Sequence, residues 1–568
     1  MYRYTEFDRR FVHARAAQFR DQLERHLAGK LGDEEFKLLR LQNGWYIQRH
    51  APMTRIAVPY GELSTRQLRT LADVADEFDR GYAHFTTRTN CQFNWIALER
   101  AADVMDRLAD ADMHGIQTSG NCIRNITAES LAGIARDEIA DPRPFCEILR
   151  QWSSLHPEFI FLPRKFKIAL NGAREDRAAL GWYDIGLQMV DDAGELGFRV
   201  LVGGGMGRTP VIGSVIREFL PWRQLLVYVE AILRVYNRWG RRDNIWKARI
   251  KILVRALGAE RFADEVDREF AEILADDLGG DAHLLTDDEL RRVTGHFVQP
   301  EGVQPRQESV RSDDGISPGY ARWLERNVHP HRVAGYRAVT LSLKRPGQAP
   351  GDATSGQMRA AADLADRYSE GEIRVTHEQN LLLPWVRADE LPDLWRDAKA
   401  SRFATPNIGL LTDIISCPGG DFCSLANARS IPIAQAVTER FADLDELFDI
   451  GDIRLNISGC MNSCGHHHAG HIGILGVDKD GSEWYQVTVG GSDGSDASGP
   501  ASPGKIVGPS FSAGEVPDVV EALIEAYLRG RLPGERFVDA VRRLGVEPFK
   551  AAADSARHDA AIAPEVAA

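Results

Sequence analysis

Four cysteines in the second half of the chain are the residues best suited to bind a metal centre. Cys417 and Cys423 stand in SCPGGDFCSLA, and Cys460 and Cys464 stand in SGCMNSCG, with 36 residues between the two pairs. Thiolates at such spacing serve zinc, an iron–sulfur cluster or disulfides. The gap of five residues in the first pair is wide for a zinc hairpin, where about two to four are usual.

The expected compartment bears on the choice between these uses. The start of the chain, MYRYTEFDRRF, lacks the apolar core of a signal peptide, so we expect a cytoplasmic protein. Disulfides are disfavoured in that reducing environment. An iron–sulfur cluster and zinc both stay open on spacing alone.

Basic residues in the first half form a second chemical group. Arg55 lies in PMTRIAVP, Arg124 in GNCIRN, and Lys165 and Lys167 in LPRKFKIAL. We expect the two lysines to share one face of a strand, because strand side chains alternate with period two, which places them about 7 Å apart. Such a pair suits a multiply charged anion. Any one of these residues alone is more often an ordinary surface residue.

An internal repeat relates the two halves of the chain. LADVADEFDRGYAHFTTRTNCQFNWI (71–96) aligns without gaps with AADLADRYSEGEIRVTHEQNLLLPWV (361–386), at an offset of 290 residues. Each copy has the pattern of an amphipathic helix, a glycine turn and a strand, which is typical of an α+β half-domain. Arg88 in the first copy is Glu378 in the second. This predicts that only the first half keeps an anion site, unless both are solvated surface charges.

Composition limits the classes of function. The 568 residues exceed what one hydrophobic core holds, so we expect several domains or lobes. A net charge of −13 argues against a nucleic-acid binder, which needs a basic face. No stretch approaches the length of uncharged apolar sequence that spans a membrane, so we expect neither nucleic acid nor membrane as a partner.

Taken in order, these motifs resemble those of the sirohaem and [4Fe–4S] sulfite and nitrite reductase family. The resemblance covers roughly residues 46–550 and runs through PMTRIAVP, FTTRTNCQF, GNCIRN, LPRKFKIAL, LVGGGMGRTP, THEQNLLL, SCPGGDFCSLA, SGCMNSCG and LGVEPFK. It implies an α+β fold of duplicated architecture, with two ferredoxin-like half-domains and two sirohaem/[4Fe–4S] lobes related by pseudo-two-fold symmetry.

The resemblance also implies the roles of the cysteines and cations. Cys417, Cys423, Cys460 and Cys464 are expected to hold the [4Fe–4S] cluster, with the sulfur of Cys464 also bridging to the sirohaem iron. The catalytic set, which contacts the anion and supplies protons, is expected to be Arg55, Arg124, Lys165 and Lys167.

Further residues match positions that bind sirohaem in the family. They are Thr86, Arg88, Gln92, Asn94, Asn125, Arg208 and Asn462, besides Cys464. Asn94 stands where some relatives have histidine, which makes its role less secure. The histidines that follow the last cysteine are expected to pack around the cluster loop rather than ligate metal; they are His466, His467, His468 and His471.

The resemblance favours six-electron reduction of sulfite to sulfide in sulfur assimilation and cysteine biosynthesis. Assimilatory reduction of nitrite to ammonium is the alternative within the family. A non-catalytic redox or sensor protein and a zinc-stabilised scaffold are alternatives of other classes. No flavin-binding pattern is evident, so the electron donor is expected to be a ferredoxin or a separate flavoprotein reductase.

These markers predict the domain organisation. Residues 490–504, GGSDGSDASGPASPG, are expected to form a flexible surface loop. The segments that we expect are an N-terminal extension (1–50), half-domain 1 (51–117), sirohaem-binding lobe 1 (118–260), a charged connection (261–325), half-domain 2 (326–402), the [4Fe–4S]/sirohaem lobe 2 (403–550) and a C-terminal tail (551–568).

Overall fold

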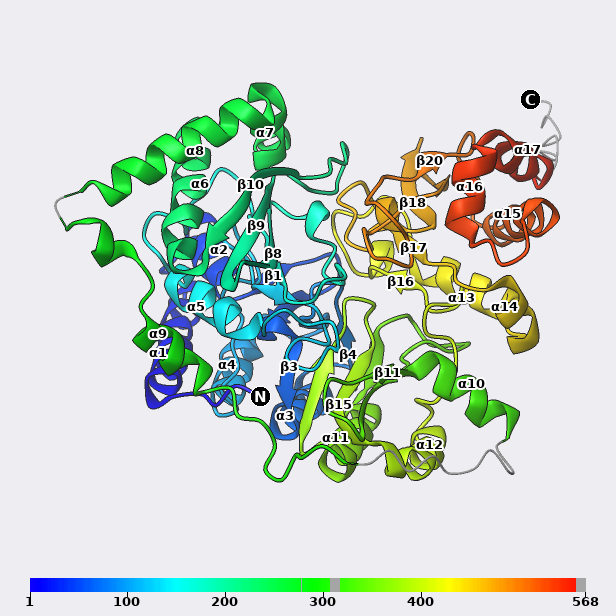
Figure 1. Ribbon diagram of the computed structural model, residues 1–568, viewed down its shortest axis with the longest axis horizontal. Coiled ribbons are helices and arrows are strands. Elements are labelled where there is room, and N and C mark those ends of the chain that lie inside the picture. The colour runs from blue at the N-terminus through cyan, green and yellow to red at the C-terminus, as the bar shows by residue number, and fades with distance from the viewer. Residues whose placement is uncertain (277, 307–316, 558–568) are drawn as a thin grey trace. The chain divides into compact units, whose positions relative to one another are not determined.

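The computed structural model describes residues 1–276, 278–306 and 317–557 (Figure 1). Its contacts divide the chain into two compact units. Unit 1 comprises residues 1–344, 350–408 and 493–501, and unit 2 comprises residues 345–349, 409–492 and the chain from 502 onward. Residues 307–316 of the predicted connection and 558–568 of the predicted tail lie outside the described residues.

Two five-stranded sheets in unit 1 carry the predicted repeat. Their strand orders are β1-β2-β5-β4-β13 and β11-β12-β15-β14-β3. The strands of the first sheet are β1 (Trp45–Ile47), β2 (Pro52–Ile56), β5 (Cys91–Phe93), β4 (Tyr82–Phe85) and β13 (Asp352–Thr354). Those of the second are β11 (Val328–Pro330), β12 (Tyr336–Leu341), β15 (Leu381–Arg387), β14 (Glu372–Val375) and β3 (Glu62–Ser64).

The two half-domains exchange one strand each. Strand β3 precedes the helix of the first copy but pairs with β14 of the second. Strand β13 precedes the helix of the second copy but pairs with β4 of the first. Neither sheet is complete without the other half of the repeat, so the two half-domains form one interlocked body.

The matching helices of the repeat are α3 (Thr65–Phe78) and α11 (Ser355–Tyr368). Each begins after a hydroxyl residue, Ser64 or Thr354, whose side chain accepts a hydrogen bond from the backbone N–H three residues later. This capping box satisfies N–H groups that a helix start leaves unpaired. The apolar faces of both helices belong to one hydrophobic core.

Ion pairs between α3 and α11 obey the same symmetry. Arg69 pairs with Asp363 at 2.6 Å, and Arg359 pairs with Asp73 at 2.8 Å. The offset of 290 residues interchanges these two pairs, arginine for arginine and aspartate for aspartate. The predicted duplication is therefore present in side-chain contacts as well as in the backbone.

Each unit also contains a mixed sheet, and the two sheets have the same topology. Three strands run parallel and the next two are antiparallel, in the orders β6-β7-β8-β9-β10 and β16-β17-β18-β19-β20. In unit 1 the strands are β6 (Thr127–Ala128), β7 (Ile168–Asn171), β8 (Ile185–Asp192), β9 (Glu195–Val202) and β10 (Ser214–Pro221). In unit 2 they are β16 (Ile415–Ser416), β17 (Leu455–Ser458), β18 (Ile472–Lys479), β19 (Ser482–Val489) and β20 (Lys505–Ile506).

The remaining α-helices pack around these sheets. Unit 1 has α1 (Glu6–Leu27), α2 (Asp33–Gln42), α4 (Ala101–Ala109), α5 (Arg143–Ser153), α6 (Leu225–Trp239), α7 (Ile250–Leu257), α8 (Ala259–Leu274), α9 (Asp287–Thr294), α10 (Pro318–Asn327) and α12 (Leu391–Ala400). Unit 2 has α13 (Ile431–Arg440), α14 (Leu444–Ile450), α15 (Val516–Gly530), α16 (Phe537–Leu544) and α17 (Glu547–Ser555). Within the described ranges, none of the helices combines the length and hydropathy that a bilayer crossing requires.

Two local expectations need correction. Lys165 and Lys167 are not strand residues, because β7 begins only at Ile168. The backbone N–H of Lys167 donates to the side chain of Asp184 at 2.8 Å and is unavailable to a strand ladder. The predicted flexible loop is wrong as well, since its Ser492, Ser495 and Ser498 are buried and Ser492 is bridged to Ser502.

Candidate functional site

Arg55 and Arg124 of the predicted catalytic set meet at one backbone carbonyl in unit 1. Arg55 lies on β2, and Arg124 lies in the loop before β6. Their guanidinium groups donate to the carbonyl oxygen of Thr118 at 3.4 Å and 2.8 Å. Arg124 also donates to the carbonyl of Gly120 at 2.8 Å. The loop at residues 118–120 therefore sets the positions of both cations.

Gln92 and Asn94 extend this arrangement. Gln92 is the cross-strand partner of Arg55 in the β2–β5 pair, and its side-chain oxygen accepts from Arg55 at 3.0 Å. The amide nitrogen of Gln92 donates in turn to Asn94 at 2.8 Å. These two predicted cofactor residues orient Arg55, in addition to any contact that they make with the cofactor.

The side chain of Arg88 has the hydrogen-bonding capacity that a sirohaem carboxylate needs. Its Nη2 donates to the carbonyl of Asn125 at 2.5 Å, while its Nη1 is buried without a hydrogen-bond partner in the part of the chain that the structure describes. Burying an unpaired guanidinium N–H is costly. A carboxylate of a polycarboxylate cofactor would satisfy it, so Arg88 fits the predicted role.

The turn that carries Arg88 is built by Thr86. Its hydroxyl oxygen accepts hydrogen bonds from the backbone N–H groups of Arg88 and Asn90 at 3.3 Å and 3.2 Å. Asn125 joins this turn because its side-chain nitrogen donates to Asn90 at 2.8 Å. Thr86 and Asn125 therefore position the arginine, whatever contacts they make with the cofactor.

Lys167 lies among other cations. Burial, together with Arg88, Lys165 and Arg249, lowers the pKa of Lys167 well below its ordinary value, and Asp184 opposes this shift. Asp184 is fully buried, and Arg249 holds its two carboxylate oxygens at 2.8 Å and 2.9 Å. The carboxylate of Asp184 is thus already bound by Arg249. The cation group of Lys167, Arg88, Lys165 and Arg249 therefore keeps an excess of positive charge.

Three residues that sequence reasoning missed support this group. Two of them are Asp184 and Arg249. The third is the buried Lys251, whose Nζ donates to the carbonyls of Met206 and Thr209 at 2.6 Å and 2.5 Å. It thereby ties down the glycine-rich loop LVGGGMGRTP. The available signal was the alternation of basic and apolar residues in KARIKIL, which repeats the pattern of RKFKIAL.

Arg208, the predicted sirohaem contact in the same glycine-rich loop, does not lie with the buried cations. Arg208 is exposed, so the structure does not bring it into the buried cation group. Its contact with sirohaem stays a prediction.

In unit 2 the sheet places the first cysteine of each pair. Cys417 follows β16 and Cys460 comes two residues after β17. The carboxyl ends of these parallel neighbours lie at the same sheet edge. The backbone N–H of Gly459 donates to the sulfur of Cys417 at 3.2 Å. Cys423 and Cys464 follow in the loops after the first members.

The thiols of the two cysteine pairs influence one another electrostatically. Burial raises the pKa of Cys417 to about 12, with Cys464 and Cys460 adding to the rise. Burial raises the pKa of Cys460 to about 11, with contributions from Cys464 and Cys423, while hydrogen bonds from Asn462 oppose it.

These thiols fit a multi-iron cluster. The fit rests on the type of donor atom and not on a preformed ligand cluster, because no group of three or more Cys, His, Asp or Glu side chains among the described residues is placed to hold a metal ion. Crowded thiols resist ionisation without a cation between them, and thiolates are the ligands that a [4Fe–4S] cluster uses. Cys417, Cys423, Cys460 and Cys464 would therefore hold the cluster, with Asn462 beside Cys460.

Two of the histidines after Cys464 pack into unit 2. His467 is buried, and its Nδ1 lies 3.1 Å from the hydroxyl of Ser463. Burial lowers the pKa of His471 to about 3, and its Nδ1 accepts from the backbone N–H of Arg454 at 3.2 Å. Both rings have hydrogen-bond partners within the protein fold.

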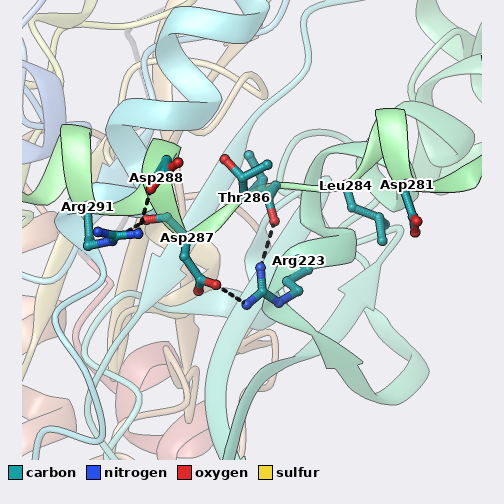
Figure 2. Close-up of a pocket in the computed structure, with 8 residues that line it drawn as sticks. Arg223, Asp281, Leu284, Thr286, Asp287, Asp288 and Arg291 are labelled. Carbon is teal, nitrogen blue, oxygen red and sulfur yellow. Dashed lines mark hydrogen bonds and ion pairs between the residues drawn. The ribbon is translucent and has the colours of Figure 1, made fainter.

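A surface hollow of about 420 Å³ in unit 1 lies between Arg223 and α9. Figure 2 shows its arginines turned towards acidic neighbours. Arg223 donates to Asp287 at 2.6 Å, and Arg291 donates to Asp288 at 2.5 Å. Its positive charges are neutralised locally, which distinguishes it from the cation group around Lys167.

Comparisons with known proteins agree with this geometry. A family model described as the nitrite and sulphite reductase 4Fe-4S domain matches residues 119–274 and 410–559. A second, described as the nitrite/sulfite reductase ferredoxin-like half domain, matches residues 46–111 and 329–401. Together they cover both lobes and both half-domains, which confirms the α+β fold and its duplication.

Curated relatives include enzymes named for either oxyanion. A ferredoxin–nitrite reductase of Synechococcus elongatus is 29% identical over 485 residues, covering 82% of this chain and 85% of the relative. A sulfite reductase [ferredoxin] of Mycobacterium tuberculosis is 27% identical over 504 residues, covering 86% and 82%. The solved structure of Mycobacterium tuberculosis NirA protein has a similar fold, with a TM-score of 0.76 at 24% identity over 93% of this chain and 94% of that one.

The family model, the duplicated fold and the cysteine set agree on the cofactors, which are sirohaem and a [4Fe–4S] cluster. The chain belongs to the nitrite and sulphite reductase 4Fe-4S family of oxidoreductases.

Proposed function

We propose that this chain reduces sulfite to sulfide. The supporting observation is the positive excess around Lys167, where Arg88, Lys165 and Arg249 act on one lysine and the carboxylate of Asp184 opposes them. Sulfite is partly a dianion at neutral pH, whereas nitrite is a monoanion. A site with uncompensated positive charge favours the more highly charged substrate.

The residues of the site have distinct tasks in this proposal. Arg55 and Arg124 are held by the Thr118 carbonyl and present N–H donors to the oxyanion. Lys167 has a lowered pKa, which makes its ammonium group a better proton donor as oxygen leaves as water. When bound, sirohaem and the cluster would pass electrons from an external donor to the anion.

Nitrite reduction is the second candidate, because the Synechococcus relative that covers 82% of this chain is named for nitrite. The deciding experiment is steady-state kinetics of the cofactor-loaded enzyme with a reduced dye as donor. It compares kcat/KM for sulfite and nitrite and quantifies sulfide and ammonium. A higher kcat/KM for sulfite supports the proposal, and a higher value for nitrite contradicts it.

Lys167→Asn is expected to change the preference between the two anions. Removing one positive charge weakens the interaction with a dianion more than with a monoanion. We expect kcat/KM for sulfite to fall about 10-fold or more, and kcat/KM for nitrite to fall less. Lys479→Asn is the matched control, because Lys479 is exposed in unit 2 and should leave both values unchanged. Equal losses for both anions would contradict a charge-based preference.

We also propose that a separate acidic ferredoxin delivers the electrons and docks near Trp246. Residues 234–251 contain seven basic residues and one acidic residue, in a chain of net charge −13, and four of the basic residues, Arg238, Arg241, Arg242 and Lys247, are exposed. Within this segment Trp239, Ile245 and Trp246 are exposed, Trp246 by 75%. Exposed tryptophans among basic residues are typical of protein interfaces, and three residues later Arg249 reaches the buried Asp184.

The double substitution Trp246→Ala/Lys247→Glu tests this docking surface. We expect KM for an acidic ferredoxin to rise about 10-fold, while dye-driven turnover stays unchanged. Phe7→Ala is the control, because Phe7 on α1 is 70% exposed and lies outside the basic segment. An unchanged KM for ferredoxin would exclude this surface as the docking site.

A further inference from the structure

A second cavity in unit 1, of about 270 Å³, lies between α2 and the loop at residues 118–120 that holds Arg55 and Arg124. On the helix side it is lined by Lys37, Leu38, Leu41 and Gln42, and on the loop side by residues 116, 117 and 119–122. Residues 160, 161 and 164 line it as well. Most of the exposed wall is apolar, and polar side chains interrupt it, which is the usual character of a small-ligand site.

Two cations line the cavity, Lys37 and Arg164. Lys37 is paired with Glu34 at 3.1 Å. No carboxylate in the described part of the chain pairs with the guanidinium of Arg164. Burial, together with Arg249 and Arg124, lowers the pKa of Arg164. The charged form of this arginine is therefore destabilised, and an anion in the cavity would restore its stability. By contrast, both arginines of the hollow in Figure 2 already have partners.

The apolar walls define the rest of the ligand. Leu38 and Phe161 are each 55% exposed. A ligand with an apolar body would cover these two side chains. Simple oxyanions have no such surface, whereas an aromatic or branched carboxylate has one. The volume is at the lower limit for small-molecule sites, which restricts the body to about one ring.

The cavity shares a wall with the loop at residues 118–120. Ser119 and Gly120 line it, and the neighbouring carbonyls of Thr118 and Gly120 hold Arg124. The hydroxyl of Ser119 also donates to the carbonyl of Leu41 on α2. A ligand between α2 and this loop would act on the residues that set the position of Arg124.

We infer that this cavity is a binding site for a small carboxylate with an apolar body, held by Arg164, whose occupancy alters substrate binding through the 118–120 loop.

The test uses benzoate and its neutral isostere benzamide with the cofactor-loaded enzyme. Binding is measured by calorimetry and by the rate at which iodoacetamide alkylates Cys122, which lines the cavity and is only partly buried. We expect benzoate to bind about 10-fold more tightly than benzamide, to slow alkylation of Cys122, and to change KM for whichever oxyanion the enzyme reduces.

Three variants test whether Arg164 and the cavity walls bind the carboxylate. Arg164→Gln should weaken benzoate binding about 10-fold and abolish its effect on KM, with sirohaem content unchanged. Leu38→Trp should block benzoate by filling the cavity mouth, and serves if the first variant does not fold. Arg223→Gln is the matched control in the other hollow and should leave benzoate binding unchanged.

The inference is overturned by equal affinity for benzoate and benzamide, by unchanged binding in Arg164→Gln, or by an unaltered KM. Loss of sirohaem from Arg164→Gln would also overturn it, because the arginine would then belong to the cofactor site. None of these outcomes depends on the preference between sulfite and nitrite.

Discussion

Replacing Cys464 with serine is expected to lower anion reduction by about three orders of magnitude. We propose that Cys464 ligates the cluster and bridges it to the sirohaem iron, and a serine hydroxyl is a poor substitute for thiolate at iron. Cys464 lies in the loop after Cys460 and raises the pKa of both Cys417 and Cys460. The variant should lose iron and acid-labile sulfide and have an altered visible spectrum.

Cys122→Ser is the matched control for this experiment. Cys122 is the other cysteine of the described chain that is neither buried nor in the four-cysteine set. Its thiol donates to the carbonyl of Ser119 at 3.2 Å, a bond that a serine hydroxyl can also make. Iron content, spectrum and turnover should match the unsubstituted enzyme. Full turnover by the Cys464 variant with an unchanged spectrum would remove Cys464 from the ligand set.

Replacing Gly465 with alanine is expected to prevent cluster loading without touching a ligand. A Cβ at this position would collide with the carbonyl oxygen of Ile457 on β17 and lie 3.1 Å from the backbone nitrogen of Cys417. Backbone atoms cannot move aside cheaply, so the loop with Cys460 and Cys464 must shift. We expect a loss of about 3 kcal/mol in the free energy of unfolding and a low iron content.

Gly514→Ala is the control within the same unit. A Cβ there meets nothing within 4 Å, so stability and cofactor content should be unchanged. Denaturant unfolding and iron analysis of the two variants separate steric effects from a general loss of glycine flexibility. A Gly465 variant as stable and as iron-rich as the Gly514 variant would show that the loop tolerates the side chain.

Much of the site followed from residue types and spacing. The cysteine pairs, the repeat at an offset of 290 residues and the basic motifs led to the family, and the family models confirm it. Arg55, Arg124, Lys165 and Lys167 entered the predicted catalytic set through the family resemblance, because any one such cation alone is more often an ordinary surface residue. The preference between sulfite and nitrite was not identifiable, since both anions need cations at similar positions and relatives named for each are about equally similar.

Local chemistry in the sequence thus determined the family and its duplicated helix–strand unit, and it predicted the thiols and cations as the functional groups. Tertiary structure decided how they are held. The exchange of β3 and β13, the capture of Asp184 by Arg249 and the anchoring of the glycine-rich loop by Lys251 each join residues far apart in the chain. Such contacts depend on which surfaces meet after folding, and no periodicity or local spacing encodes that.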